Sequence, residues 1–268
     1  MINKTRKVRI LIICLVSLIL FSQNLAYADS LRDTIEAEVR KQYENDSEFL
    51  KEIDEKGEKW AEEYLTKVIE RRLLKYNQIS VFGDPDAIQQ VSINNIEQTS
   101  EYNCGPTNAL MVLYTAGMGS SVSGSTNAAK ITTLSGPSYC ATDNTGSYVY
   151  KVKDTINAFM PNSQKNYVYT YINSKTKLIN YVYESLSQGY AAIMHADTSK
   201  LPYWDGYGTG HYISVYYINT DSDIIKVSDS YNGYLCKNSP YLNTFGKHNI
   251  TITNAYNATS DRYLISYY

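Results

Sequence analysis

The chain has few of the residues that build metal centres and redox sites. Its 268 residues include four cysteines and three histidines, and the patterns H-E-x-x-H, C-x-x-C and the P-loop are all absent. We therefore expect neither a metal nor another cofactor. Proline is also scarce, with six residues, and none of them falls between residues 31 and 76. That stretch is therefore free to form long helices.

Long apolar runs are missing except at the N-terminus. Residues 1–28 have a basic start, an apolar run over residues 10–21 and then Ala26, Tyr27 and Ala28. This order is typical of a secretory signal peptide with an A-x-A cleavage site. A membrane anchor is the alternative, but the apolar run is shorter than the ~20 residues that span a bilayer. We therefore expect export with cleavage, and no stable membrane insertion afterwards.

A basic surface is missing as well. Removal of residues 1–28 leaves 21 lysines and arginines against 27 aspartates and glutamates, a net charge of −6. Proteins that bind nucleic acids or anionic membranes by general electrostatics carry a basic face. We therefore expect no nucleic-acid partner.

Residues 29–80 are predicted to form a helical extension. Between residues 31 and 76, apolar residues recur at i, i+4 and i+8, for example Ile35, Val39 and Tyr43. This spacing is typical of amphipathic helices. Two interpretations are open. The segment is either an ordinary extension that packs one face on the body, or a pro-segment that lies over a cleft and inhibits the protein intramolecularly.

Turn and cap residues divide the chain further. Residues 45–47, Asn-Asp-Ser, offer a helix N-cap, and Gly57 is a candidate break. Gly-Asp-Pro-Asp at residues 83–86 predicts a turn near the start of a second unit, residues 81–268. In that unit we predict helices over 107–116, 149–160 and 175–186, an extended segment over 91–96, and strands over 167–172, 190–195, 211–218, 223–227 and 263–268. The segregation of helices before strands indicates an α+β fold.

Cys104 lies in the most informative segment of the chain. It directly precedes an apolar run predicted to be helical, it is followed by Gly105 and Pro106, and Gln98 stands six residues upstream. The N-terminus of a helix stabilises a thiolate and lowers the pKa of a cysteine. The Gln98 amide and the backbone N–H of Cys104 are candidate donors to an oxyanion.

The search for a base is short because the chain has three histidines. His211 follows the glycine-rich residues 206–210 and enters a predicted strand, so that a rigid element holds it at the edge of a cleft. His195 ends another strand-like run and is the reserve candidate, and His248 is the third. Asp229 lies 18 residues after His211 at the end of the next strand, and antiparallel pairing brings the two together. An aspartate there can accept the histidine Nδ1–H.

Three cysteines remain after signal cleavage, since Cys14 lies within the signal peptide. An odd number in an exported protein indicates a free thiol or an intermolecular bridge. Two states are open for Cys104, Cys140 and Cys236. Either Cys140 and Cys236 form a disulfide that leaves Cys104 reactive, or all three thiols are reduced.

These residues together resemble the peptidases related to bacteriocin-leader-processing enzymes, within the papain-like cysteine peptidase superfamily. The resemblance covers about residues 90–235. It implies a papain-like fold in which an N-terminal helical lobe carries the nucleophile helix and a C-terminal antiparallel sheet carries the histidine and aspartate. It also implies four catalytic residues, namely Cys104 as nucleophile, His211 as base, Asp229 as the group that orients the base, and Gln98 as oxyanion donor. Ser230 follows Asp229, where such enzymes often carry proline.

The function implied by the resemblance is that of an exported thiol hydrolase acting on peptide or protein substrates. Its expected location is outside a bacterial cell, either secreted or associated with the cell surface. Two alternatives stay open. A cell-wall amidase or a transpeptidase would use the same Cys–His site, and a non-catalytic surface module would use residues 31–76 to bind a partner.

Overall fold

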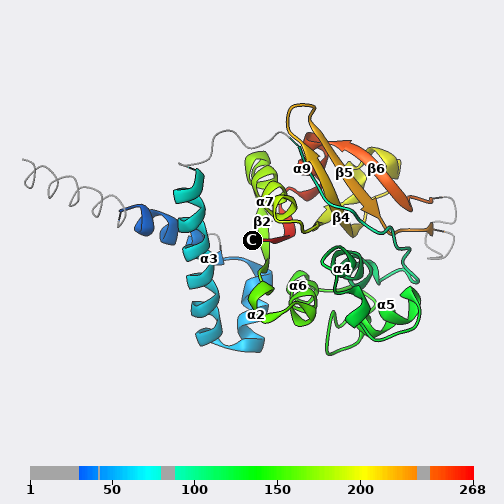
Figure 1. Ribbon diagram of the computed structural model, residues 1–268, viewed down its shortest axis with the longest axis horizontal. Helices are drawn as coiled ribbons and strands as arrows, with labels where there is room; N and C mark the ends of the chain where they lie inside the picture. The colour runs from blue at the N-terminus through cyan, green and yellow to red at the C-terminus, as the bar shows by residue number, and fades with distance from the viewer. Residues whose placement is uncertain (1–29, 42, 80–87, 234–241) are drawn as a thin grey trace, which may run out of the picture. The chain divides into compact units, whose positions relative to one another are not determined.

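The computed structural model describes residues 30–41, 43–79, 88–233 and 242–268. The chain divides into two compact units, Met1–Gly83 and Asp84–Tyr268, whose elements are drawn in Figure 1. The predicted signal peptide and the predicted turn at residues 83–86 lie outside the described residues.

The N-terminal unit is helical, as its apolar periodicity predicts. Residues 30–41 form a helix, followed by α2 (Ser47–Lys56) and α3 (Glu58–Ile79). Asp46 is the N-cap of α2, because its side chain accepts hydrogen bonds from the N–H groups of Glu48 and Phe49. Gly57 ends α2 with a φ of 86°, a conformation open to glycine. Among the described helices none, α3 included, is both long and apolar enough to cross a membrane.

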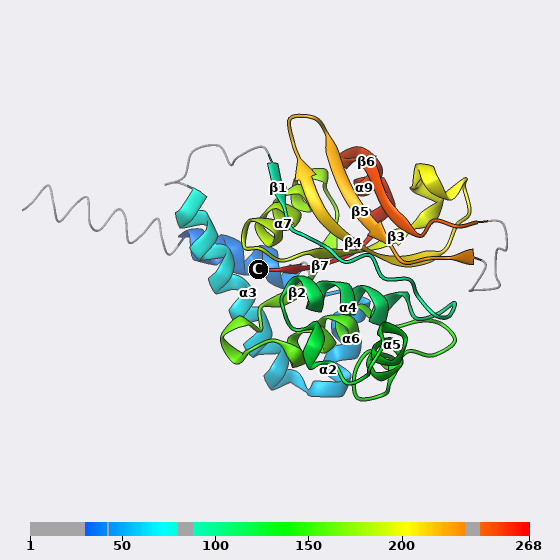
Figure 2. The same cartoon turned by 45° about the vertical axis from the view of Figure 1, so that its right-hand side comes forward.

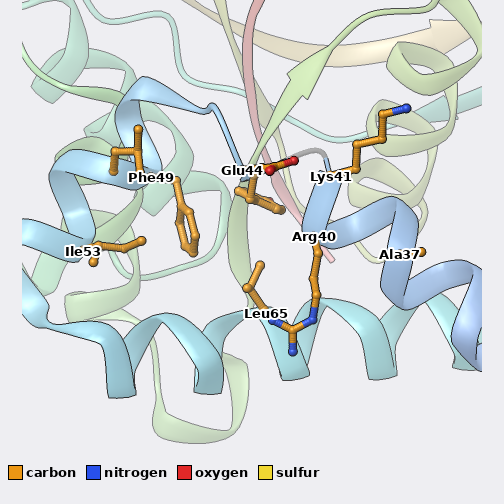
Figure 3. A pocket seen from close by; sticks show the side chains of 9 residues that line it. Ala37, Arg40, Lys41, Glu44, Phe49, Ile53 and Leu65 are labelled. Atoms are coloured by element: carbon orange, nitrogen blue, oxygen red, sulfur yellow. The ribbon is translucent and has the colours of Figure 1, made fainter.

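Four aromatic side chains form a cluster in the N-terminal unit. The rings of Tyr43, Phe49, Trp60 and Tyr64 contact one another with centroid separations of 4.9 to 5.9 Å. Figure 3 shows an open hollow beside this cluster, lined in part by Phe49 and Leu65. The hollow contains none of the candidate site residues.

The C-terminal unit is built on one antiparallel sheet. Its strands are β1 (Ile88–Gln90), β2 (Tyr167–Ile172), β3 (Ala192–Asp197), β4 (Gly210–Asn219), β5 (Ile224–Asp229), β6 (Gly246–Thr251) and β7 (Arg262–Tyr267). They lie in the order β2-β7-β3-β4-β5-β6, and β1 pairs with β4. All these pairings are antiparallel. The predicted α+β class is confirmed.

Helices lie on both faces of this sheet (Figure 2). They are α4 (Cys104–Thr115), α5 (Asn127–Ser135), α6 (Val149–Phe159), α7 (Lys175–Ser187) and α9 (Ile252–Thr259). On one face, α7 and α9 enclose an apolar core in which Leu178 and Ala255 join Ile213 of β4. On the other face α4 packs on β4, with α5 and α6 beside it. Alternate residues of β4 therefore face different layers.

Four of these elements, β1, α5, β6 and α9, do not follow from the sequence patterns. β6 is a polar strand at the edge of the sheet, in which Ile250 alone is buried. α9 is rich in asparagine and threonine, which are weak helix formers. Burial of Ala255 and Ala258 against the sheet outweighs that weak propensity. The segment 91–96, predicted to be extended, is not a strand, and β1 ends just before it.

The packing of Gly105 generates a stability prediction. A Cβ atom at this position would lie 3.1 Å from Ser147 Cβ and 3.1 Å from Val152 Cγ2. We expect Gly105→Ala to lower the free energy of unfolding by about 1–3 kcal/mol, because overpacking pushes α4 away from Ser147 and Val152. Urea denaturation measures the change. A urea midpoint equal to that of the wild type would show that Ser147 and Val152 move aside without a loss of stability.

Candidate active site

Cys104 is the first residue of α4, and its side chain is mostly buried. The helix begins earlier than the predicted residues 107–116, so the thiol lies in its first turn. Pro106 fits there because the first N–H groups of a helix have no partner within it. The positive end of the helix dipole is therefore close to the sulfur.

The pairing of β4 with β5 brings His211 and Asp229 together, as predicted. His211 Nε2 lies 2.9 Å from Asp229 Oδ1, and the two side chains are 3% and 0% exposed. Since an ionised carboxylate only accepts hydrogen bonds, Nε2 carries the proton. The predicted use of Nδ1 for this bond is wrong, and Nδ1 is the ring nitrogen left for the thiol.

Cys104 and His211 have opposed pKa shifts. Burial would raise the pKa of the Cys104 thiol, but hydrogen bonding and charge attraction from His211 outweigh it. These two effects of His211, together with hydrogen bonds from the backbone N–H groups of Tyr212 and Gly105, hold the pKa of the thiol below its ordinary value. Burial would likewise lower the pKa of His211, but the nearby Asp229 and Cys104 raise it. These shifts favour a thiolate beside an imidazolium.

Asp229 is fully buried, and each of its oxygens accepts a hydrogen bond. The Trp204 indole Nε1 donates to Oδ2 at 2.9 Å, and the backbone N–H of Tyr231 donates to Oδ1 at 2.9 Å. The Trp204 ring centroid lies 5.2 Å from that of His211, so the indole also shields the histidine–aspartate bond from water. Sequence reasoning missed Trp204, because nothing around it predicts where its indole points.

Gln98 is fully buried and belongs to the same cluster. Its Nε2 donates to the carbonyl oxygens of Ser100 at 2.9 Å and Glu101 at 3.4 Å. Its Oε1 accepts a hydrogen bond from Ser230 Oγ at 2.9 Å. Ser230 thus supplies a hydroxyl donor that proline would lack. The oxyanion role of Gln98 stays a prediction, since both hydrogen bonds donated by its Nε2 go to backbone carbonyls of the loop before Cys104.

Asn108, one helical turn after Cys104, is a second residue that sequence reasoning missed. Its side chain is fully buried. Its Nδ2 donates to Cys104 O at 2.9 Å and to Tyr212 O at 2.7 Å, and it shares one of these two hydrogens with Ser230 Oγ at 3.4 Å. Its Oδ1 accepts from Ser214 Oγ at 2.7 Å. The available signal is an asparagine inside an apolar helix, which is a position that disfavours it.

His195, the reserve candidate for the base, has different surroundings. It lies opposite Tyr212 in the β3–β4 pairing, and the two rings stack with centroids 4.8 Å apart. Burial, together with Arg262 and His211, lowers the pKa of His195 to about 4. Its ring is therefore neutral near pH 7, whereas His211 is the histidine that contacts Asp229.

Cys140 is a free and buried thiol. Its Sγ donates to Thr155 Oγ1 at 3.4 Å, and burial raises its pKa to about 12. Cys140 is therefore a thiol in the structure, and Cys236, its predicted disulfide partner, lies outside the described residues. Within the described ranges, no three histidine, cysteine, aspartate or glutamate side chains are grouped so as to hold a metal ion.

A sequence model of the Peptidase_C39 like family matches residues 89–262, and the chain belongs to this family. The match confirms the resemblance seen in the sequence and the papain-like fold that it implies. It contains all four of the predicted catalytic residues, which are Gln98, Cys104, His211 and Asp229. No curated protein matches the chain.

The opposed pKa shifts predict how Cys104 reacts with iodoacetamide. Because the pKa of the thiol is lowered, alkylation should stay fast below ~8.5, the pKa of an ordinary cysteine. In His211→Ala the stabilising charge is gone while burial remains, so alkylation should require a pH above that value. Mass spectrometry follows each cysteine separately, and Cys140 serves as the unreactive internal control. The same pH profile in both proteins would contradict the pairing.

Proposed function

We propose that this member of the Peptidase_C39 like family is an exported thiol hydrolase that cleaves peptide bonds in peptide or protein substrates. One observation carries the proposal. Cys104, at the start of α4, contacts His211, and His211 in turn lies 2.9 Å from the buried Asp229. A thiol, a base and a group that orients the base are the parts that nucleophilic catalysis requires.

In the proposed reaction, the Cys104 thiolate attacks the carbonyl carbon of the scissile peptide bond. The carbonyl oxygen becomes an oxyanion, which accepts hydrogen bonds from the backbone N–H of Cys104 and from the Gln98 amide. Of the two Gln98 hydrogen bonds through nitrogen, the one to Glu101 O is longer, at 3.4 Å. We assign the N–H of that weaker bond to the oxyanion.

Proton transfer through His211 completes the proposed cycle. The imidazolium gives its proton to the leaving amine as the C–N bond breaks, and the acyl group stays on Cys104 as a thioester. His211 then removes a proton from water, the resulting hydroxide attacks the thioester, and the carboxylic acid product leaves. Asp229 keeps the ring in position and stabilises its charged form throughout.

We also propose that the protein acts outside a bacterial cell, secreted or at the cell surface. This part of the proposal rests on the sequence of residues 1–28, in which a basic start, an apolar run and an A-x-A site follow one another.

Profiling on a diverse peptide library tests the proposal. We expect cleavage by the wild type and a loss of roughly a millionfold in rate for Cys104→Ala, because the nucleophile is removed. Equal cleavage by the two proteins would contradict the assignment. Release of amino groups from purified peptidoglycan, with no peptide cleaved, would instead identify an amidase with the same site.

A further inference from the structure

We propose that Asn108 is a positioning residue, which fixes the nucleophile helix against the strands that carry His211 and Asp229. The inference rests on the proposed function and adds to the site a residue that belongs to none of the predicted catalytic groups. It is carried by hydrogen bonds among buried atoms.

Asn108 bonds to Cys104 itself and to the residues that follow His211 and Asp229. On α4 it binds the carbonyl oxygen of Cys104 itself at 2.9 Å. On β4 it binds the carbonyl oxygen of Tyr212, the residue after His211, at 2.7 Å. After β5 it reaches the hydroxyl of Ser230, the residue after Asp229, at 3.4 Å. One side chain thus joins the three segments on which the site is built.

Ser230 extends these contacts to Gln98. The Ser230 hydroxyl donates to Gln98 Oε1 at 2.9 Å, and the backbone N–H of Gln98 donates to Ser230 O at 2.9 Å. The Asn108 amide, the Ser230 hydroxyl and the Gln98 amide therefore form one continuous chain. We call these three residues, with Ser214, the Asn108 network.

The surroundings of Asn108 favour a positioning role over plain packing. The residues that follow it, from Ala109 to Leu113, are fully buried and apolar, and another apolar residue would avoid the cost of burying an amide. What the amide adds is a fixed register between α4 and β4. Tyr212, whose carbonyl it holds, also supplies one of the N–H groups that stabilise the Cys104 thiolate. A shift of α4 along the strand would therefore change both the nucleophile and its surroundings.

The test compares Asn108→Leu with Thr107→Val. Leucine is close in volume but removes every hydrogen bond of the side chain. Thr107 is the matched control, because it is buried on the same helix and its hydroxyl donates at 2.7 Å to Asn103 O, next to α4 and away from the strands. We expect Asn108→Leu to lower kcat about a hundredfold with KM little changed, as small misplacements do. Alkylation of Cys104 should move to higher pH in this variant, and Thr107→Val should change neither quantity.

Wild-type kcat and alkylation profile in a folded Asn108→Leu would overturn the proposal. If that variant does not fold, Ser214→Ala removes one bond of the Asn108 network and Ser230→Ala removes two, and both variants should shift the two quantities in the same direction. The alkylation profile needs no substrate. If the wild type cleaves no peptide while Asn108→Leu still moves the profile, the proposed function fails and the positioning role stands.

Discussion

The buried hydrogen bond between His211 and Asp229 is the interaction on which the rest of the site depends. A carboxylate removed from water is costly unless it is paired and hydrogen-bonded. Asp229 meets this condition with the His211 ring, the Trp204 indole and the Tyr231 N–H. The carboxylate then stabilises a charged imidazole, and the imidazolium stabilises a thiolate at Cys104. The imidazolium of His211 thus depends on the Asp229 carboxylate, and the Cys104 thiolate depends on the imidazolium.

The fold brings these three charged groups together from elements that are distant in sequence. Antiparallel pairing of β4 with β5 places His211 beside Asp229. Cys104 is at the start of α4, which packs on β4 of the same sheet. The backbone of α4 is tied to β4 through Asn108. A papain-like site therefore needs a fixed distance between a helix and a sheet as well as the right residue types.

The sequence alone predicts much of this arrangement, for physical reasons. Strands β4 and β5 are apolar and joined by a short turn, so their pairing and the meeting of His211 with Asp229 follow from register. The details that depend on side-chain direction do not follow. The choice of Nε2 over Nδ1, the indole of Trp204 and the inward amide of Asn108 are set by tertiary packing. For the same reason β6 and α9, whose compositions are polar, were not predicted.

Nitrogen NMR of His211 at neutral pH tests the central claim most directly, and the chain has only three histidines to assign. We expect both ring nitrogens of His211 to carry protons while Cys104 is present, and the ring to become neutral at lower pH in Cys104→Ala than in the wild type. A His211 ring that is neutral at Nδ1 in the wild-type protein at neutral pH would contradict the account.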